Sequence, residues 1–401
     1  MSKLSTLAKF SVVLGTSVSC LAFVSADQAY GLIPVLKNAT KSSSAPKPEA
    51  PLRNWGLENS ENSSINARKA WRISKGSKRI VVAIIDTGID PNHADLKDNI
   101  CRTKGEYGFD FVTNKKNPGD AHGHGSHVAG IVGGSARNPI GGASGVAPNI
   151  CIMAVRYYSD TASGAQNLAN TVKAINYAVD HGANVINYSG GGAEFSAAEM
   201  KAIQRAEAKG VVFVAAAGNE YQDTDKSGNA YFPAAYGLSN IIAVAGTNQK
   251  SELLPSSNWG KKHVHVAAPG ENIYSTLPKG RYGYLTGTSQ ATAFVSGLAA
   301  LILSEIPGLK PFEVRDIIMK TVDKSAKLEG KIASGGRINA YAALRMVLAR
   351  REGKNSRTLA FLDKQDREEA ARLAANANGT RAGGKSAVSK TIQAIRAVSP
   401  Q

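Results

Sequence analysis

Short runs of apolar residues alternate with amphipathic stretches along most of this 401-residue chain. The run Ile80–Ile85 is apolar at every position, which is typical of a strand buried on both faces of a sheet. The segments 167–181 and 196–209 carry helical periodicity, and each is followed by a glycine that suits a helix end. Further strand-like runs occupy 152–155, 185–187, 211–216 and 241–245. The alternation predicts an α/β fold, a three-layer sandwich in which helices flank a mostly parallel β-sheet.

The first 26 residues have the layout of a secretory signal peptide. Two lysines precede an apolar stretch, and small residues ending at Ala26 provide a cleavage site. The apolar stretch is too short and too interrupted by serine for a membrane span, so we expect no stable membrane insertion. Cys20 leaves a lipid-anchored form open, although Ser17 stands where such sites usually carry leucine. The pattern predicts a secreted protein, extracellular or periplasmic.

Composition divides the rest of the chain into three parts. Residues 27–52 are polar and bear several prolines, as a short leader or linker does. The stretch before Trp55 is too short to bury its own core, so we expect folding without a separate chaperone domain. The patterned region, residues 53–349, predicts one large domain. Residues 350–401 are basic and alanine-rich and predict a largely flexible tail, with one helix-prone stretch at 362–375 and little to bury.

The formal net charge of +17 is large enough to raise the question of nucleic acid or a membrane surface as a partner. The positive charge is densest after Arg350, outside any motif, and no zinc-finger or RNP-type signature accompanies it. We therefore interpret it as a solubilising surface with basic tails and expect no nucleic-acid partner.

Two cysteines, Cys101 and Cys151, remain once the predicted signal peptide is removed. An even count in an exported chain is compatible with one disulfide. Cys101 follows the strand at 80–85 and Cys151 opens the next strand, so adjacent strands near one sheet edge could bring them together. We expect a disulfide between them.

Three separated segments carry residues suited to catalysis. Asp86 ends the buried strand at 80–85, and ligand or catalytic groups of open parallel sheets lie beyond the carboxyl ends of the strands. His124 stands among glycines at the start of a predicted helix, where a carboxylate could fix it as a general base. Ser289 begins a strongly apolar helix whose positive end would lie near its hydroxyl.

Each of these segments also has a plainer interpretation. Many strands end in aspartate at a turn, and a serine at the start of a helix is often only a cap. His122, His124 and His127 lie within six positions and raise the alternative of a metal site, but no acidic third ligand has helical spacing. The combination of the three segments is more specific than any one of them.

Together the three segments resemble the subtilase family, over roughly residues 55–348. The matching motifs are the Asp-Thr-Gly box at Asp86, His-Gly-Ser-His-Val-Ala-Gly at His124 and Gly-Thr-Ser-x-Ala-Thr at Ser289, and subtilisin has the same order of Asp, His and Ser. The resemblance implies a secreted serine endopeptidase in which Ser289 forms the acyl-enzyme, His124 takes its proton and Asp86 holds the imidazole. It implies polypeptide substrates and no organic cofactor, and we expect a monomer.

The resemblance also assigns residues around the reacting bond. Asn219 matches the position whose side-chain amide binds the oxyanion together with the Ser289 backbone N–H. Ser189, Gly190 and Gly191 match the strand edge that pairs with the substrate backbone. Gly190 replaces a residue that is usually leucine, which alters one wall of the specificity pocket.

A structural calcium ion is implied by a further match. Asp95, nine residues after Asp86, corresponds to a family calcium ligand, and Asn138 opens a loop resembling the one that supplies carbonyl and amide oxygens. Hard oxygen ligands of this kind suit calcium. The alternative is a surface turn beside an exposed carboxylate.

The chain departs from the family at three positions near the serine: it has Gln290, Ala293 and Phe294 where Met, Pro and His are usual. None of these changes removes a proton-transfer group, so we expect activity. A catalytically silent fold used as a secreted binding module is one rival, but degenerate members usually lose a triad residue or the oxyanion asparagine. A peptide- or ester-selective processing enzyme of the same fold stays open.

Overall fold

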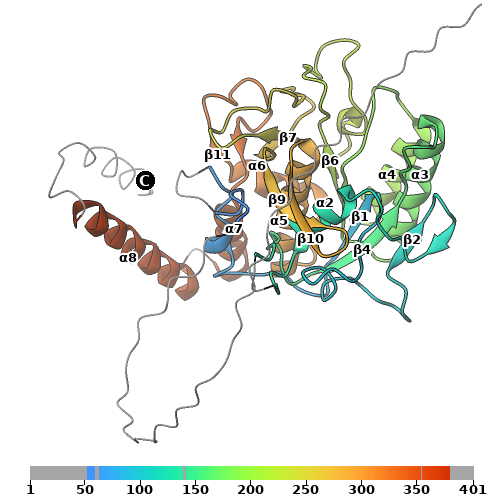
Figure 1. Ribbon diagram of the computed structural model, residues 1–401. Helices are drawn as coiled ribbons and strands as arrows, with labels where there is room; N and C mark the ends of the chain where they lie inside the picture. Colours follow the sequence, from blue (N-terminus) through green and yellow to red (C-terminus); the bar gives the residue numbers. More distant parts are fainter. Residues whose placement is uncertain (1–51, 59–62, 139–140, 354, 380–401) are drawn as a thin grey trace, which may run out of the picture. The chain divides into compact units, whose positions relative to one another are not determined.

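The computed structural model describes residues 52–58, 63–138, 141–353 and 355–379, which all belong to one compact unit that begins at Ala50 (Figure 1). The predicted signal peptide, Cys20 and nearly all of the predicted linker lie outside the described residues.

A sheet of ten strands forms the middle layer, in the order β11-β12-β8-β7-β6-β5-β1-β4-β2-β3. Its six central strands pair in parallel: β1 (Val81–Asp86), β4 (Cys151–Arg156), β5 (Val185–Tyr188), β6 (Val212–Ala216), β7 (Ile241–Thr247) and β8 (Val266–Pro269). Each edge ends in a short antiparallel pair, β2 (Gly108–Asp110) with β3 (Lys115–Lys116) and β11 (Asp323–Lys324) with β12 (Gly336–Arg337). A separate hairpin joins β9 (Ile273–Leu277) and β10 (Arg281–Leu285).

Helices cover both faces of this sheet. Alternate residues of each central strand point to opposite faces, so each face presents side chains against which helices can pack. Val82 and Ile84 of β1 belong to one buried cluster, and Ala83 and Ile85 belong to another. The first cluster includes residues of α1 (Ala67–Ala70), α2 (His124–Gly133), α5 (Thr288–Glu305), α6 (Pro311–Lys320) and α7 (Ala340–Glu352). The second includes residues of α3 (Gly164–Asp180), α4 (Ala197–Ala208) and the short 3-10 helix η1 (Ala234–Tyr236). The predicted three-layer α/β sandwich is confirmed.

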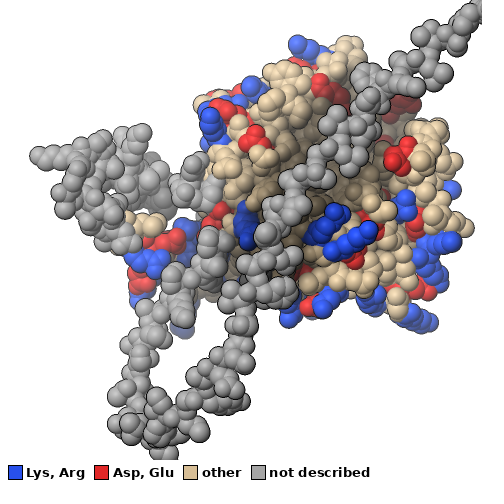
Figure 2. All heavy atoms as spheres, in the orientation of Figure 1, with Lys and Arg blue, Asp and Glu red and all other residues tan. Residues whose placement is uncertain are grey.

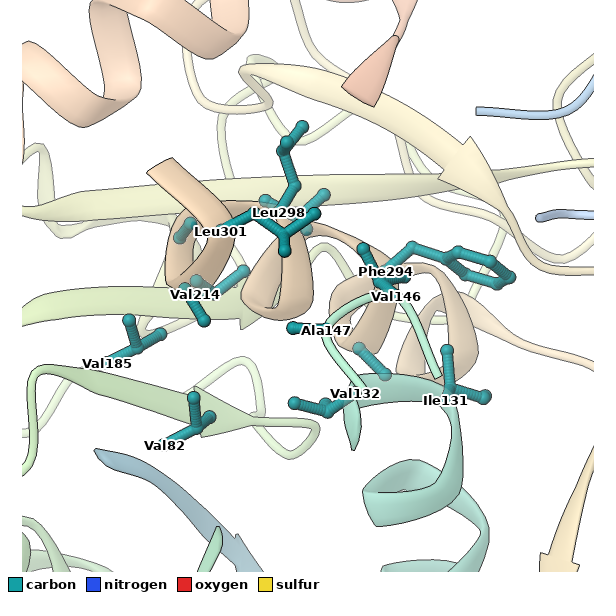
Figure 3. Close-up of a cluster of buried hydrophobic side chains, with 14 of the residues drawn as sticks. Val82, Ile131, Val132, Val146, Ala147, Val185, Val214, Phe294, Leu298 and Leu301 are labelled. Atoms are coloured by element: carbon teal, nitrogen blue, oxygen red, sulfur yellow. The ribbon is translucent and has the colours of Figure 1, made fainter. Parts of the chain in front are cut away.

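Helix α5 is buried over almost its whole length, which explains why its sequence is apolar all round. Figure 3 shows Phe294, Leu298 and Leu301 of α5 above the strand residues Val185 and Val214. The helix therefore lies against the centre of the sheet, with Ser289 in its first turn.

The last described helix, α8 (Arg357–Gly379), is longer than the helix-prone stretch expected at 362–375. Leu359 and Leu362 are buried against Leu348, where the composition had suggested little to bury. Ion pairs join the same helix to two other segments. Asp363 pairs with Arg345 of α7, and Asp366 pairs with Arg72, which lies just after α1. Spacing alone could not reveal these partners, because Arg72, for example, is 294 residues away from Asp366 in the sequence.

The described surface carries both signs of charge. On the face seen in Figure 2, Lys and Arg side chains are scattered among Asp and Glu. Within the part of the chain that the structure describes, no helix is long and apolar enough to cross a membrane.

The predicted disulfide is present between Cys101 and Cys151, whose Cα atoms are 5.1 Å apart. The backbone N–H of Cys101 donates to Ile152 O at 2.9 Å, so the bridge lies where the chain before β2 runs parallel to the start of β4. It links residues 50 positions apart in sequence.

Replacing both cysteines by serine (C101S/C151S) should lower the thermal unfolding midpoint, because the bridge removes conformational entropy from the unfolded chain. For a loop of this length the chain-entropy relation gives about 4 kcal/mol. Thermal unfolding followed by circular dichroism, beside the oxidised parent and the parent in reducing buffer, measures the loss. Equal midpoints for all three proteins would contradict the prediction.

Candidate active site

The carboxylate of Asp86 and the ring of His124 form the centre of the site. Asp86 is the last residue of β1, is 3% exposed and receives the backbone N–H of Thr87 on Oδ1 at 2.8 Å. His124 Nδ1 lies 2.8 Å from Asp86 Oδ1 and 3.0 Å from Oδ2. Because a carboxylate only accepts, Nδ1 carries the proton and Nε2 keeps a lone pair.

His124 is held at the first position of α2 by the turn before it. Gly123 has φ 102°, in the left-handed region that favours glycine. Asp120 receives the backbone N–H groups of Gly123 at 2.7 Å and Ser126 at 2.9 Å, and these would otherwise be unpaired at the helix start. The sequence pattern did not indicate this role of Asp120. Its position four residues before the helix, within a glycine-rich stretch, is the only local signal.

Two opposed effects set the charge of His124. Burial lowers its pKa, while the negative charge of Asp86, their hydrogen bond and the charge of Asp120 raise it. The net pKa of His124 lies above its ordinary 6.5. This is the direction expected when a carboxylate stabilises an imidazolium.

The other two histidines of the motif do not converge on a metal. His127 is buried in α2, its Nε2 lies 3.3 Å from Gly283 O, and burial lowers its pKa to about 4. His122 is exposed, with its ring 6.3 Å from that of His124. Among the described residues, no group of three His, Cys, Asp or Glu side chains could hold a metal ion.

Ser289 lies in the first turn of α5 and is 8% exposed. Its hydroxyl donates to Ser189 O at 3.2 Å, and Ser189 Oγ donates back to Ser289 O at 3.2 Å. Within the described residues, no hydrogen bond joins Ser289 to His124. Catalytic hydrogen bonds are often long or misaligned before substrate binds. Here the hydroxyl must turn away from Ser189 to reach the imidazole.

Asn219 lies beside the start of the same helix. Its Oδ1 accepts from Thr288 N at 3.0 Å and from Thr288 Oγ1 at 3.2 Å. These contacts orient the amide so that Nδ2 remains as a donor, and Nδ2 has no hydrogen-bond partner among the described residues. The side chain is exposed, so that donor is accessible to a ligand.

The structure places Ser189, Gly190 and Gly191 directly after β5, with Ser189 against Ser289. A Cβ added to Gly190 would lie 2.2 Å from the hydroxyl oxygen of Tyr157. Tyr157 therefore fills the space that a larger residue at position 190 would take. This contact is absent from the sequence motif because Tyr157 directly follows β4, more than 30 residues earlier.

The family model described as "Subtilase family" matches residues 77–341. The chain belongs to the subtilase family. Its matched part is 42% identical to the thermophilic serine proteinase of Bacillus sp. (strain AK1) over 69% of this chain and 64% of that protein. Thermitase of Thermoactinomyces vulgaris is 40% identical over 70% of this chain and 93% of its own length. This subtilase therefore spans less than two thirds of the first relative and nearly all of the second.

A solved protease from Pseudoalteromonas arctica PAMC 21717 has a similar fold, with a TM-score of 0.62 and 28% sequence identity. The similarity covers 73% of this subtilase and 97% of that chain.

The two expected calcium ligands, Asp95 and Asn138, come together through a hydrogen bond. Asp95 is fully buried, and its carboxylate accepts from Asn138 N at 2.9 Å, Ala143 N at 2.8 Å and Tyr282 Oη at 2.7 Å. The Arg53 guanidinium lies against the same loop, 2.9 Å from where a Cβ on Gly141 would be.

Calcium takes six to eight oxygen ligands. Here hydrogen-bond donors point at both oxygens of the carboxylate, and a cation lies close to the loop. The alternative of an exposed carboxylate is wrong, because Asp95 is buried and closes the loop through hydrogen bonds. The calcium site stays a prediction, since residues 139–140 of the same loop lie outside the described residues.

Tyr282→Phe should lower the thermal unfolding midpoint of this subtilase, because it removes the hydrogen bond from the tyrosine hydroxyl to the buried carboxylate of Asp95. Losing a hydrogen bond to a buried charged group costs about 1.5–3 kcal/mol. Tyr284→Phe is the matched control, since Tyr284 is exposed and lies two residues away on the same strand. Equal midpoints for Y282F and Y284F would contradict the prediction.

Proposed function

We propose that this subtilase is an exported serine endopeptidase that cleaves polypeptides through an acyl-enzyme on Ser289. The observation that carries the proposal is the hydrogen bond of 2.8 Å between His124 Nδ1 and the buried carboxylate of Asp86. Helices α2 and α5, which carry His124 and Ser289 in their first turns, pack against each other.

Proton transfer follows from the state of the imidazole. Asp86 keeps the proton on Nδ1, so Nε2 is the acceptor for the proton of Ser289 Oγ. The freed oxygen attacks the carbonyl carbon, and the imidazolium returns the proton to the leaving amine. Water then repeats the sequence on the acyl-enzyme, with His124 again as base. Asp86 stabilises the charged ring throughout and does not need to change its own protonation state.

The negative charge that develops on the carbonyl oxygen requires donors already in place. The Nδ2 group of Asn219 is one candidate, since Thr288 holds the opposite end of its amide. The backbone N–H of Ser289 is the other, because N–H groups in the first turn of a helix lack intrahelical partners. Both donors stand next to the serine that would carry the acyl group.

An extended substrate would pair with the edge formed by Ser189, Gly190 and Gly191, by adding a strand. The carbonyl of Ser189 already accepts a hydrogen bond from Ser289, so this edge passes next to the nucleophile. Such pairing reads the backbone of the substrate and favours unfolded or extended polypeptide segments.

Export is proposed from the signal-peptide pattern of residues 1–26, which lies outside the described residues. The disulfide between Cys101 and Cys151 supports it, since disulfides persist mainly in oxidising compartments. Mass spectrometry of the culture medium and of the cell fraction tests both the compartment and the cleavage after Ala26.

Ser289→Ala should abolish peptide turnover and covalent labelling by a fluorophosphonate, because both require the hydroxyl. In subtilisin, removal of the serine lowers turnover by about 10⁶-fold. Ser304→Ala is the matched control, since Ser304 lies on the same helix and only donates to Ala300 O. Turnover of a casein substrate and gel-based labelling measure the effect. Undiminished proteolysis by purified S289A would disprove the assignment of the nucleophile.

The pH dependence of kcat/KM should follow His124. Only the neutral ring accepts a proton, so the rate is low below the raised pKa and increases as pH passes through it, with a midpoint above 6.5. NMR titration of the His124 ring in S289A gives the same pKa without turnover. Asp86→Asn removes the charge that raises this pKa and should lower both the midpoint and, by about 10⁴-fold, the rate. A parent midpoint below 6.5 would contradict the arrangement.

A further inference from the structure

A cavity of about 570 Å³ opens beside the proposed substrate-pairing edge. Gly191 and Gly192 form one side, and Tyr157, Tyr188 and Phe232 contribute aromatic walls. The cavity lies between the first turns of α3 and α4, two helices that pack side by side on the same face of the sheet (Figure 1). Its volume is within the range of pockets that bind ligands. No step of the peptide hydrolysis described above uses it.

A buried carboxylate lines this cavity. Glu199 is the third residue of α4 and is only 3% exposed. Its Oε2 accepts a hydrogen bond from Tyr236 Oη at 2.7 Å, while Oε1 has no hydrogen-bond partner among the described residues. Burial raises the pKa of Glu199, which is the response of a carboxyl group without a compensating cation.

The sequence offers a structural role for Glu199, but the structure does not use it. Ser196 and Glu199 have the spacing of a capping box, in which the glutamate would bond to the backbone N–H of the serine. Here Ser196 N donates to Tyr236 Oη at 3.2 Å instead. The carboxylate of Glu199 is therefore turned toward the tyrosine and the cavity, with one oxygen left to accept from a ligand.

The charge around the cavity has one sign. Glu194, which is exposed, lines it together with Glu199, and no Lys, Arg or His is among its described lining residues. This is unusual for a chain whose formal net charge is +17. Aromatic faces attract cations, and a carboxylate forms strong charge-assisted hydrogen bonds with them.

From this geometry we infer that the cavity is a subsite for a lysine or arginine side chain of the polypeptide substrate, and that Glu199 determines this specificity. The inference rests on the proposed peptidase function. Gly191 is two residues along the edge from Ser189, which is roughly 7 Å at the rise of a strand. A side chain that enters the cavity therefore belongs to a substrate residue a few positions from the cleaved bond.

Paired fluorogenic peptides test the inference with the protein as it is purified from the culture medium. Each pair carries Lys or its uncharged analogue norleucine at one position, and the position is moved along the peptide on both sides of the cleaved bond. At one position kcat/KM should be at least about tenfold higher for Lys, the size of a hydrogen bond to a charged group. Arg at that position should also be preferred.

Glu199→Gln should reduce this preference to near unity while kcat/KM for the norleucine peptide changes little. The ratio of two substrates on one variant separates specificity from stability, because a folding defect lowers both rates together. Glu207→Gln is the matched control, since Glu207 is on the same helix and does not line the cavity. It should keep the preference. A parent enzyme without a Lys preference at any position, or a preference that survives in E199Q, would overturn the inference.

Failure of the proposed function has a different signature, namely no cleavage of any peptide and no fluorophosphonate labelling. In that case, calorimetric titration of the Lys and norleucine peptides into S289A still tests the cavity. Tighter binding of the Lys peptide that is lost in S289A/E199Q supports the subsite, and equal binding overturns it.

Discussion

The hydrogen bond between the buried carboxylate of Asp86 and His124 is the interaction on which the site depends. A carboxylate that is 3% exposed is costly to leave without partners, and here it receives a backbone N–H as well as the imidazole. The low exposure strengthens the attraction between the carboxylate and the charged ring. The same interaction fixes the tautomer and raises the pKa of His124, so orientation and basicity have one cause.

The sheet makes this pair possible. β1 lies between β4 and β5, with both faces covered by helices, and a strand in that position delivers its last residue to a dry, rigid edge. Helix α5 crosses the same region with nearly all of its residues buried, which fixes the position of Ser289 relative to the strands. Dense packing of this kind transmits small changes, so core substitutions on α5 can disturb the geometry at Ser289 without touching it.

The apolar runs were sufficient to predict the centre of the fold. The runs at 80–85 and 241–245 became β1 and β7 with boundaries shifted by one or two residues, because burial on both faces leaves a strong pattern in the sequence. The two-residue edge strands, such as β3 and β11, were not predicted, because so few residues carry no periodicity. Of the residues expected from the motifs, His124 contacts Asp86, and Ser189 and Asn219 contact the first turn of α5, which carries Ser289. Their roles stay proposals.

Side chains that come from distant segments were beyond the sequence patterns. Tyr157 fills the space at Gly190, and Tyr282 donates to the carboxylate of Asp95 where an ion was expected. Both are tyrosines whose partners lie 33 or more residues away, and neither belongs to a motif. A motif records which residue types stand near each other along the chain, whereas these contacts depend on how β4 and β10 are placed in the fold.

The contrast between the charge of the whole chain and the charge of the cavity gives the inferred subsite its physical meaning. A net charge of +17 would by itself disfavour the approach of a basic peptide. That repulsion is screened over about 10 Å at ordinary ionic strength, whereas a contact inside a cavity is screened far less. Selection of a basic side chain therefore requires a local, desolvated carboxylate. Glu199 meets this requirement because burial removes competing water and Tyr236 holds one of its oxygens in place.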